Sequence, residues 1–176
     1  MAHARSRIDW TIPGFRALLD ALGVSIVDGA PKVPVHLGSD AGRVELVAVG
    51  WATVELDRAE ADLRVDLVTA FEPANRDALL GASVRRSKGT EPEVLLLEPD
   101  TEGRMAGALA RHGEGPIALY LRVEAHAPRP ADVVTRPGTG PLGPERLVLG
   151  DSPWGPFVLL GGGSSPDNPD RVPSEP

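Results

Sequence analysis

One segment of the chain, residues 44–56, constrains the fold most because its side chains alternate in kind along its whole length. Every even position is apolar or small, namely Val44, Leu46, Ala48, Gly50, Ala52, Val54 and Leu56. Successive side chains of a β-strand point to opposite faces, so this period of two predicts a long strand with one buried face. Such a strand needs partners, and the chain is therefore expected to build a sheet around it.

Other segments supply those partners and the helices that cover them. Strands are expected at residues 24–27, 32–37, 79–86, 93–98 and 117–124, with a hairpin formed by 145–150 and 156–160. Helices are expected at about 13–22, at 58–67 with Asp57 as N-cap, and from Asp100 or Thr101 to Gly113. Loops are expected around Pro73 and over residues 127–144, where Pro and Gly are frequent. This order of elements predicts an α+β fold.

The composition limits the class of protein. Hydrophobic residues make up 41% and charged residues 24% of the chain, the formal net charge is −7, and cysteine is absent. The negative charge argues against nucleic acid as a partner, and the absence of a long apolar run argues against a membrane partner. Without cysteine there is no disulfide, thiolate chemistry or cysteine-bound zinc, which fits a cytoplasmic protein.

Generic motifs of chemistry are weak in this sequence. Residues 138–143 match the letters of a dinucleotide-binding G-x-G-x-x-G, but Pro141 and Pro144 remove amide donors and a strand follows, so we interpret the segment as a loop. The histidines are scattered rather than paired at metal-ligand spacing. The basic run at residues 85–88 is interpreted as the solvated edge of a hairpin.

Two longer segments resemble a known superfamily. One is LVAVGWATVELDRA at residues 46–59, and the other is VLLLEPDTEGRMAGALARHGEGPIAL at residues 94–119, with LGA at 80–82 between them. Together they resemble the vicinal-oxygen-chelate superfamily, which holds glyoxalase, bleomycin-resistance and extradiol-dioxygenase proteins. The "LEP" turn, the helix and the "GEG" turn of the second segment are most similar to methylmalonyl-CoA epimerase-like members.

The resemblance implies a curved, mostly antiparallel sheet built from βαβββ modules. The matching domain would span residues 44–160, after an N-terminal extension over 1–43 that contains the first helix. The second module is expected to be truncated, because no helical pattern lies between Ala125 and Pro144. The tail, residues 161–176, is rich in Gly, Ser, Pro and Asp and is expected to be disordered.

The resemblance also implies where a metal would be bound. Enzymes of the superfamily carry four ligands on inner strands, and the matching positions here are Ala48, Leu95, Ala118 and Leu159. An aliphatic side chain offers no donor atom to a cation. We therefore expect no metal at this position and no cofactor.

Candidate binding residues share a strand face with Ala118. The alternation places Tyr120, Arg122 and Glu124 on that side, and it places Leu46 beside Ala48 on the neighbouring strand. This polar face either lines a ligand pocket, with Tyr120 as hydrogen-bond donor and Arg122 as anion clamp, or is a sheet surface exposed to solvent.

Three functions remain open from the sequence. The one we favour is a metal-free protein that binds a small, anionic or polar organic molecule in the cup of its sheet. The second is an isomerase, lyase or dioxygenase in which Tyr120 and Glu124 act as acid and base and Arg122 stabilises charge. The third is a structural or partner-binding module, and edge-to-edge pairing of open sheets would make the protein a homodimer.

Overall fold

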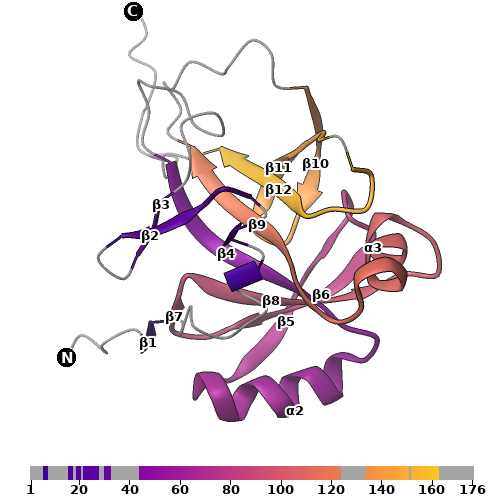
Figure 1. Ribbon diagram of the computed structural model, residues 1–176. Helices are drawn as coiled ribbons and strands as arrows, with labels where there is room; N and C mark the ends of the chain where they lie inside the picture. The colour runs from indigo at the N-terminus through magenta and orange to yellow at the C-terminus, as the bar shows by residue number, and fades with distance from the viewer. Residues whose placement is uncertain are drawn as a thin grey trace, which may run out of the picture.

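The computed structural model describes residues 6–7, 16–17, 19–20, 22–27, 30–32, 44–123, 134–150 and 152–162. Within these residues one eight-stranded, curled sheet forms the body of the molecule (Figure 1). Its strands, in spatial order, are β10 (Thr135–Gly140), β11 (Gly143–Val148), β12 (Phe157–Gly162), β9 (Gly115–Val123), β4 (Val44–Ala52), β8 (Glu93–Pro99), β6 (Ala82–Ser87) and β5 (Phe71–Asp77).

Short strands and two helices complete the described structure. β1 (Ser6–Arg7) pairs in parallel with β7 (Thr90–Glu91), and β2 (Ser25–Val27) forms a hairpin with β3 (Ala30–Lys32). The helices are α2 (Leu56–Leu67) and α3 (Arg104–His112). No described helix is long and apolar enough to cross a membrane.

The sheet contains the same pattern twice. β4 and β9 are antiparallel neighbours at its centre, and each pairs in parallel with the last strand of its own half, β8 and β12 respectively. Antiparallel strands follow outward on both sides, β6 and β5 in one half and β11 and β10 in the other. The prediction of an α+β fold with a curved, mostly antiparallel sheet is confirmed. The truncation of the second module was expected over residues 125–144; residues 134–144 contain β10 and the start of β11, and residues 124–133 lie outside the described residues.

The two predicted loops are wrong in part, because both contain strands. Pro73 lies in β5 and Pro137 lies in β10, and these are the two edge strands of the sheet. Proline has no backbone N–H to donate, and an edge strand needs donors toward one neighbour only. The prolines therefore lead to a prediction of loops, although the backbones of these segments form the edge strands of the sheet.

The predicted N-caps are also wrong. Neither helix has a side-chain cap from its own first turn, and the N-cap residues are Glu55 for α2 and Gly103 for α3. At the start of α2 the Leu56 amide donates to Glu98 Oε2 at 2.8 Å, and the Val54 amide donates to Glu114 Oε1 at 2.8 Å. The Leu56 amide, an unpaired donor of the first turn, is thus satisfied by a carboxylate distant in sequence, and a second such carboxylate holds the residue just before the N-cap.

The start of α3 is held in a similar way by a distant group. The Met105 amide donates to the Leu80 carbonyl at 2.9 Å. Asp100, expected as a cap, forms an ion pair with Arg76 instead. Gly113 ends the helix as expected, with a φ of 75° that favours glycine.

Two hydrophobic cores lie on the two faces of the sheet. The outer core joins α2 to the central strands through Ala59, Leu63, Leu67, Val49, Val94, Leu96, Leu119, Leu121 and Val158. The inner core fills the curl of the sheet, and α3 contributes Met105 and Ala108 to it. Leu46 was expected on the inner face but belongs to the outer core, because a register shift between Leu46 and Ala48 interrupts the alternation.

The ends of the chain are described in part. Of the helix expected at 13–22, Arg16, Ala17, Leu19 and Asp20 are helical, and Leu22 already belongs to a turn. Leu19 is buried in the outer core. β12 continues to Gly162, so the disorder predicted for 161–176 is wrong for its first two residues, and residues 163–176 lie outside the described residues.

Candidate functional site

The four positions that the resemblance assigns to a metal lie together on the inner face. Ala48, Leu95, Ala118 and Leu159 come from β4, β8, β9 and β12, are 0% exposed, and belong to the same core. Their side chains contain no donor atom, so the residues present do not fit a metal ion. Within the described residues, no group of three or more His, Cys, Asp or Glu side chains is placed to hold one.

Tyr120 occupies the space above this floor. It is 1% exposed, and its hydroxyl donates to Asp77 Oδ2 at 2.7 Å. Gly50 on the facing strand makes the space, because a Cβ there would lie 3.2 Å from Tyr120 Cε2 and 2.7 Å from Leu97 Cδ1. The deep part of the cup is thus filled by the protein's own side chains.

Asp77 anchors the turn that follows β5. Its Oδ1 accepts the amides of Leu79 and Leu80, each at 2.9 Å, while its Oδ2 accepts the Tyr120 hydroxyl. The carboxylate is fully buried, which raises its pKa, and the hydrogen bonds from Leu80 and Tyr120 partly oppose that rise. The expected strand at 79–86 begins at Ala82 because this turn takes residues 78–81.

Glu145 on β11 is a second buried carboxylate near the first. It is 3% exposed, its Oε1 accepts the Leu142 amide at 3.2 Å, and its Oε2 has no hydrogen-bond partner among the described residues. Burial, followed by the charge of Asp77, raises the pKa of Glu145 to about 7. Burial also raises the pKa of Tyr120 well above its ordinary value.

The sequence reasoning missed both carboxylates, although one signal was present. Asp77 falls in a segment read as loop, so its inward position had no visible sign. Glu145 and Leu147 are two residues apart in β11, and Leu147 is buried in the inner core. The period of two therefore already placed Glu145 on the inner face.

The predicted site residues have different surroundings. Tyr120 and Arg122 both line a small cavity of about 40 Å³, together with Val47, Leu121, Leu142, Glu145 and Gly161. The Arg122 side chain is 57% exposed, and its Nη1 lies 3.0 Å from Glu45 Oε2. Glu124 lies outside the described residues. The structure thus brings Tyr120 and Arg122 to one cavity, while the tyrosine hydroxyl is bonded to Asp77.

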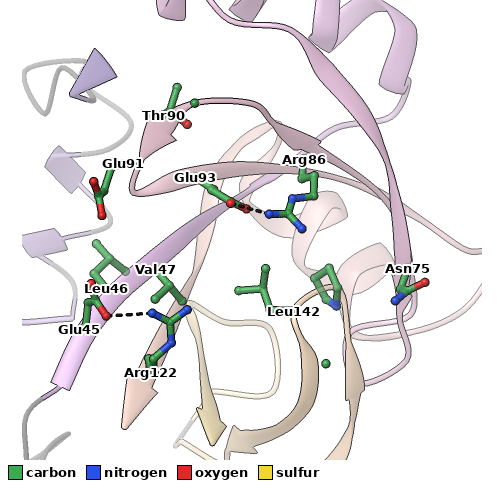
Figure 2. A pocket seen from close by; sticks show the side chains of 13 residues that line it. Glu45, Leu46, Val47, Asn75, Arg86, Thr90, Glu91, Glu93, Arg122 and Leu142 are labelled. Carbon is green, nitrogen blue, oxygen red and sulfur yellow. Dashed lines mark hydrogen bonds and ion pairs between the residues drawn. The ribbon is translucent and has the colours of Figure 1, made fainter. Parts of the chain in front are cut away.

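A larger cleft of about 560 Å³ opens beside this cavity. Figure 2 shows two ion pairs on opposite sides of it, Arg122 with Glu45 and Arg86 with Glu93, and Val47 and Leu142 between them. Val47, Arg122 and Leu142 line both spaces, so the small cavity lies next to the cleft. Arg86, interpreted from sequence as part of a solvated edge, is one of the lining residues.

Arg85 and Arg86 are neighbours in β6, and their side chains point to opposite faces of the sheet. Arg85 bonds to Asp57 and Glu60 of α2 at 2.6 Å each, on the outer face. Arg86 points into the cleft and bonds to Glu93 at 2.6 Å. The alternation of the strand sends one guanidinium to the helix and the next to the candidate site.

Comparison with known proteins identifies the fold. No protein-family model and no curated protein matches the chain. The methylmalonyl-CoA epimerase of Mycobacterium tuberculosis is 18% identical with a TM-score of 0.55, over 74% of this chain and 92% of that one. A Streptomyces coelicolor methylmalonyl-CoA epimerase in complex with 2-nitronate-propionyl-CoA is 16% identical with a TM-score of 0.53, over 69% and 95%.

A third solved structure has a similar fold. It is a hypothetical protein from Bacillus halodurans, 16% identical with a TM-score of 0.54, over 70% of this chain and 95% of that one. At such identities the likeness concerns the fold alone. The chain has the vicinal-oxygen-chelate fold, as seen in the methylmalonyl-CoA epimerases.

Proposed function

We propose that this protein binds a small, anionic or polar organic molecule without a metal, in the part of the cup that its own side chains leave open. The observation that carries the proposal is the cleft of about 560 Å³ bordered by the Arg122–Glu45 and Arg86–Glu93 pairs. The volume lies within the usual range of small-molecule sites, and the largely charged and polar lining suits a charged or polar ligand rather than an apolar one.

The floor of the cup supports a role without a metal. Its four candidate ligand positions are hydrocarbon, and Tyr120 covers them. Binding in the cleft needs neither a donor set nor a vacant floor, so the loss of the family's ligands is compatible with it. The epimerase neighbour from Streptomyces coelicolor, with 2-nitronate-propionyl-CoA bound, supports a small organic ligand on this fold.

Arg122 is the cation best suited to exchange its partner for a ligand. Its side chain and that of Glu45 are 57% and 52% exposed, whereas Arg86 and Glu93 are 37% and 26% exposed. Exposed ion pairs contribute little to stability, so a ligand carboxylate can replace Glu45 at low cost. The planar guanidinium can then donate two parallel hydrogen bonds to the carboxylate.

The experiment is a thermal-shift screen of small carboxylic acids and acyl-CoA thioesters in the presence of EDTA, followed by calorimetry on the compounds that bind. A hydrogen bond to a charged group is worth roughly 1.5–3 kcal/mol, so Arg122→Ala should weaken binding about tenfold or more. The matched control is Arg64→Ala, an exposed arginine of α2 away from the cleft. Equal affinity of both variants, or binding that EDTA abolishes, would reject the proposal.

A further inference from the structure

The two edges of the curled sheet touch each other at a contact that we call the seam. The Ala78 amide, directly after β5, donates to the Thr139 carbonyl of β10 at 3.0 Å. Beside this bond the Leu79 side chain lies against Gly138, where a Cβ would be only 2.6 Å from Leu79 Cδ2. The seam therefore consists of a backbone hydrogen bond and a side chain packed against a glycine.

The β10–β11 hairpin takes part in both the seam and the cleft. β11 is paired with β12 from Glu145 to Leu147, so residues 140–144 form a tip that extends past the last of these pairs. The cleft of about 560 Å³ is lined in part by this tip, through Pro141, Leu142 and Gly143. A movement of the tip that opens the seam therefore also changes the shape of the cleft.

Glu145 lies at the base of the tip, and the tip covers its carboxyl group. The residue is 3% exposed, its Oε1 accepts the Leu142 amide at 3.2 Å, and its Oε2 packs against Gly140 without a hydrogen-bond partner among the described residues. Burying an unpaired charge costs far more than burying a neutral polar group. The closed position of the tip therefore suits the protonated carboxyl group better than the carboxylate.

The groups that face Glu145 do not offset a negative charge on it. Asp77, on the other side of the seam, accepts three hydrogen bonds, which favour its ionised form. Tyr120 lines the small cavity with Glu145, but its hydroxyl donates to Asp77. Arg122 lines the same cavity, but its Nη1 is directed to Glu45. Burial, followed by the charge of Asp77, raises the pKa of Glu145 to about 7, so ionisation occurs near neutral pH.

We infer that the tip of the β10–β11 hairpin is a lid, which stays closed while Glu145 is protonated and opens at the seam when Glu145 ionises. Opening moves Gly140 away from Oε2, so that water can solvate the carboxylate. The closed form binds the proton more tightly than the open form, so it is most favoured at acidic pH and loses this advantage as the pH rises to about 7. The role of the lid rests on the proposed function, because the cleft is the site that it would regulate.

The test is amide hydrogen exchange of the protein without ligand, followed by NMR at the Ala78 amide and corrected for the intrinsic effect of pH. If opening returns Glu145 to its ordinary pKa of 4.5, the protection of Ala78 should fall about tenfold per pH unit between pH 5 and pH 7 and then level off. Protection that stays constant over this range would overturn the inference.

Dilute urea separates opening of the lid from unfolding of the whole chain. The reference is the buried Thr53 amide, which donates to the Leu97 carbonyl at 3.0 Å in the centre of the sheet. Local opening exposes little surface, so exchange at Ala78 should be faster than at Thr53 and nearly independent of urea. Equal urea dependence at both amides would show that the seam opens only on unfolding, and the lid would be wrong.

Three variants assign the effect to Glu145 and to the seam. Glu145→Gln cannot ionise, so the protection of Ala78 should no longer change with pH. The matched control Glu102→Gln, at an exposed position outside the cleft, should keep the full change. Gly138→Ala should lower the protection of Ala78 at every pH, because its Cβ must displace Leu79. The same pH dependence in Glu145→Gln as in the unaltered chain would also overturn the inference.

The lid and the proposed function fail separately, because the exchange measurements need no ligand. If acids bind through Arg122 and the protection of Ala78 does not change with pH, the lid is wrong and the binding function stands. If the seam opens as the pH rises and no acid depends on Arg122, the anionic part of the proposed function is wrong. Exchange is measured first on the unaltered chain, so it is decisive even if a variant fails to fold.

Discussion

Two regions of the molecule differ in how well their residues match the superfamily's motifs. At the start of α2, Glu98 of the "LEP" turn and Glu114 of the "GEG" turn accept the Leu56 and Val54 amides, and Glu114 also accepts the Thr53 hydroxyl at 2.7 Å. On the floor of the cup, the four positions of a metal-ligand set are Ala or Leu and are fully buried. The residues that resemble the superfamily's motifs therefore support the scaffold, whereas the positions matched to its metal ligands contain no donor atom.

This difference explains how the chain can resemble the superfamily in sequence and yet lack the metal ligands that the resemblance implies. Glu98 and Glu114 hold a helix start that has no local side-chain cap, so losing them would cost the fold. The floor positions need only apolar side chains, and Tyr120 and Leu97 pack with them in the inner core. Four mutational and pH predictions test this contrast between the floor and the helix start.

The largest effect is expected at the floor. Tyr120→Ala removes a fully buried ring and leaves a cavity, so the free energy of unfolding should fall by about 3–5 kcal/mol. Urea unfolding monitored by circular dichroism measures this loss. Tyr120→Phe, which removes the hydroxyl bonded to Asp77, should cost about 1–3 kcal/mol. A small loss in the alanine variant would mean that the floor is open rather than filled.

The next effect is a pH dependence that arises from Glu145. Its pKa is raised from 4.5 to about 7, so the folded state binds the proton more tightly than the unfolded state does. The contribution of Glu145 to the free energy of unfolding should therefore be largest below pH 4.5, fall by up to about 3 kcal/mol as the pH rises to 7, and then level off. Urea unfolding across this range checks it, and in Glu145→Gln most of the fall should disappear.

A smaller effect of opposite sign is expected at Glu114. Its pKa is lowered to about 2, first by the hydrogen bond from Arg58 and then by the Val54 amide. The stabilisation should be complete above pH 4.5 and should be lost as the pH falls toward 2. Glu114→Ala should cost about 0.5–1.5 kcal/mol at neutral pH, because it removes hydrogen bonds to the Val54 amide and the Thr53 hydroxyl. If acid unfolding of the variant matches that of the unaltered protein, these hydrogen bonds do not stabilise the segment before α2.

The smallest effect is expected at Glu98, which accepts one amide of α2. Glu98→Ala should cost about 1 kcal/mol, and Glu98→Gln should cost less because its amide oxygen still accepts. Glu102→Ala, an exposed change nearby in sequence, provides the baseline. Thermal unfolding measures all three variants under the same conditions. A loss for Glu98→Ala no larger than the baseline would show that the bond to Leu56 is not needed.

The sequence predicts the central strands better than the edges. β4, β8 and β9 show period-two or continuous apolar patterns because both of their neighbours are strands and their faces are buried. β5 and β10 contain Pro73 and Pro137, which the edge tolerates, and so they resemble loops. The register shift near Leu46 could not be predicted from the alternation of side chains, because a bulge interrupts that alternation within one strand.

The candidate site likewise contains residues that the sequence predicts and residues that it does not. Arg122 and Tyr120 were found because they share a face with Ala118, and Glu145 was within reach of the same reasoning through Leu147. The Arg122–Glu45 and Arg86–Glu93 pairs join different strands, and their partners depend on register and curl, which the sequence does not contain. Asp77 was hidden because its turn is defined by a bond to a tyrosine 43 positions away.

The most direct test of the central claim is one affinity measured under two conditions. The claim is that the ligand is held in the cleft and that the aliphatic floor contributes no metal. Calorimetry with the tightest-binding acid of the screen is done once in EDTA and once with excess Co²⁺. The account predicts the same Kd in both. Binding at least tenfold tighter with Co²⁺, lost again when EDTA is added, would contradict it.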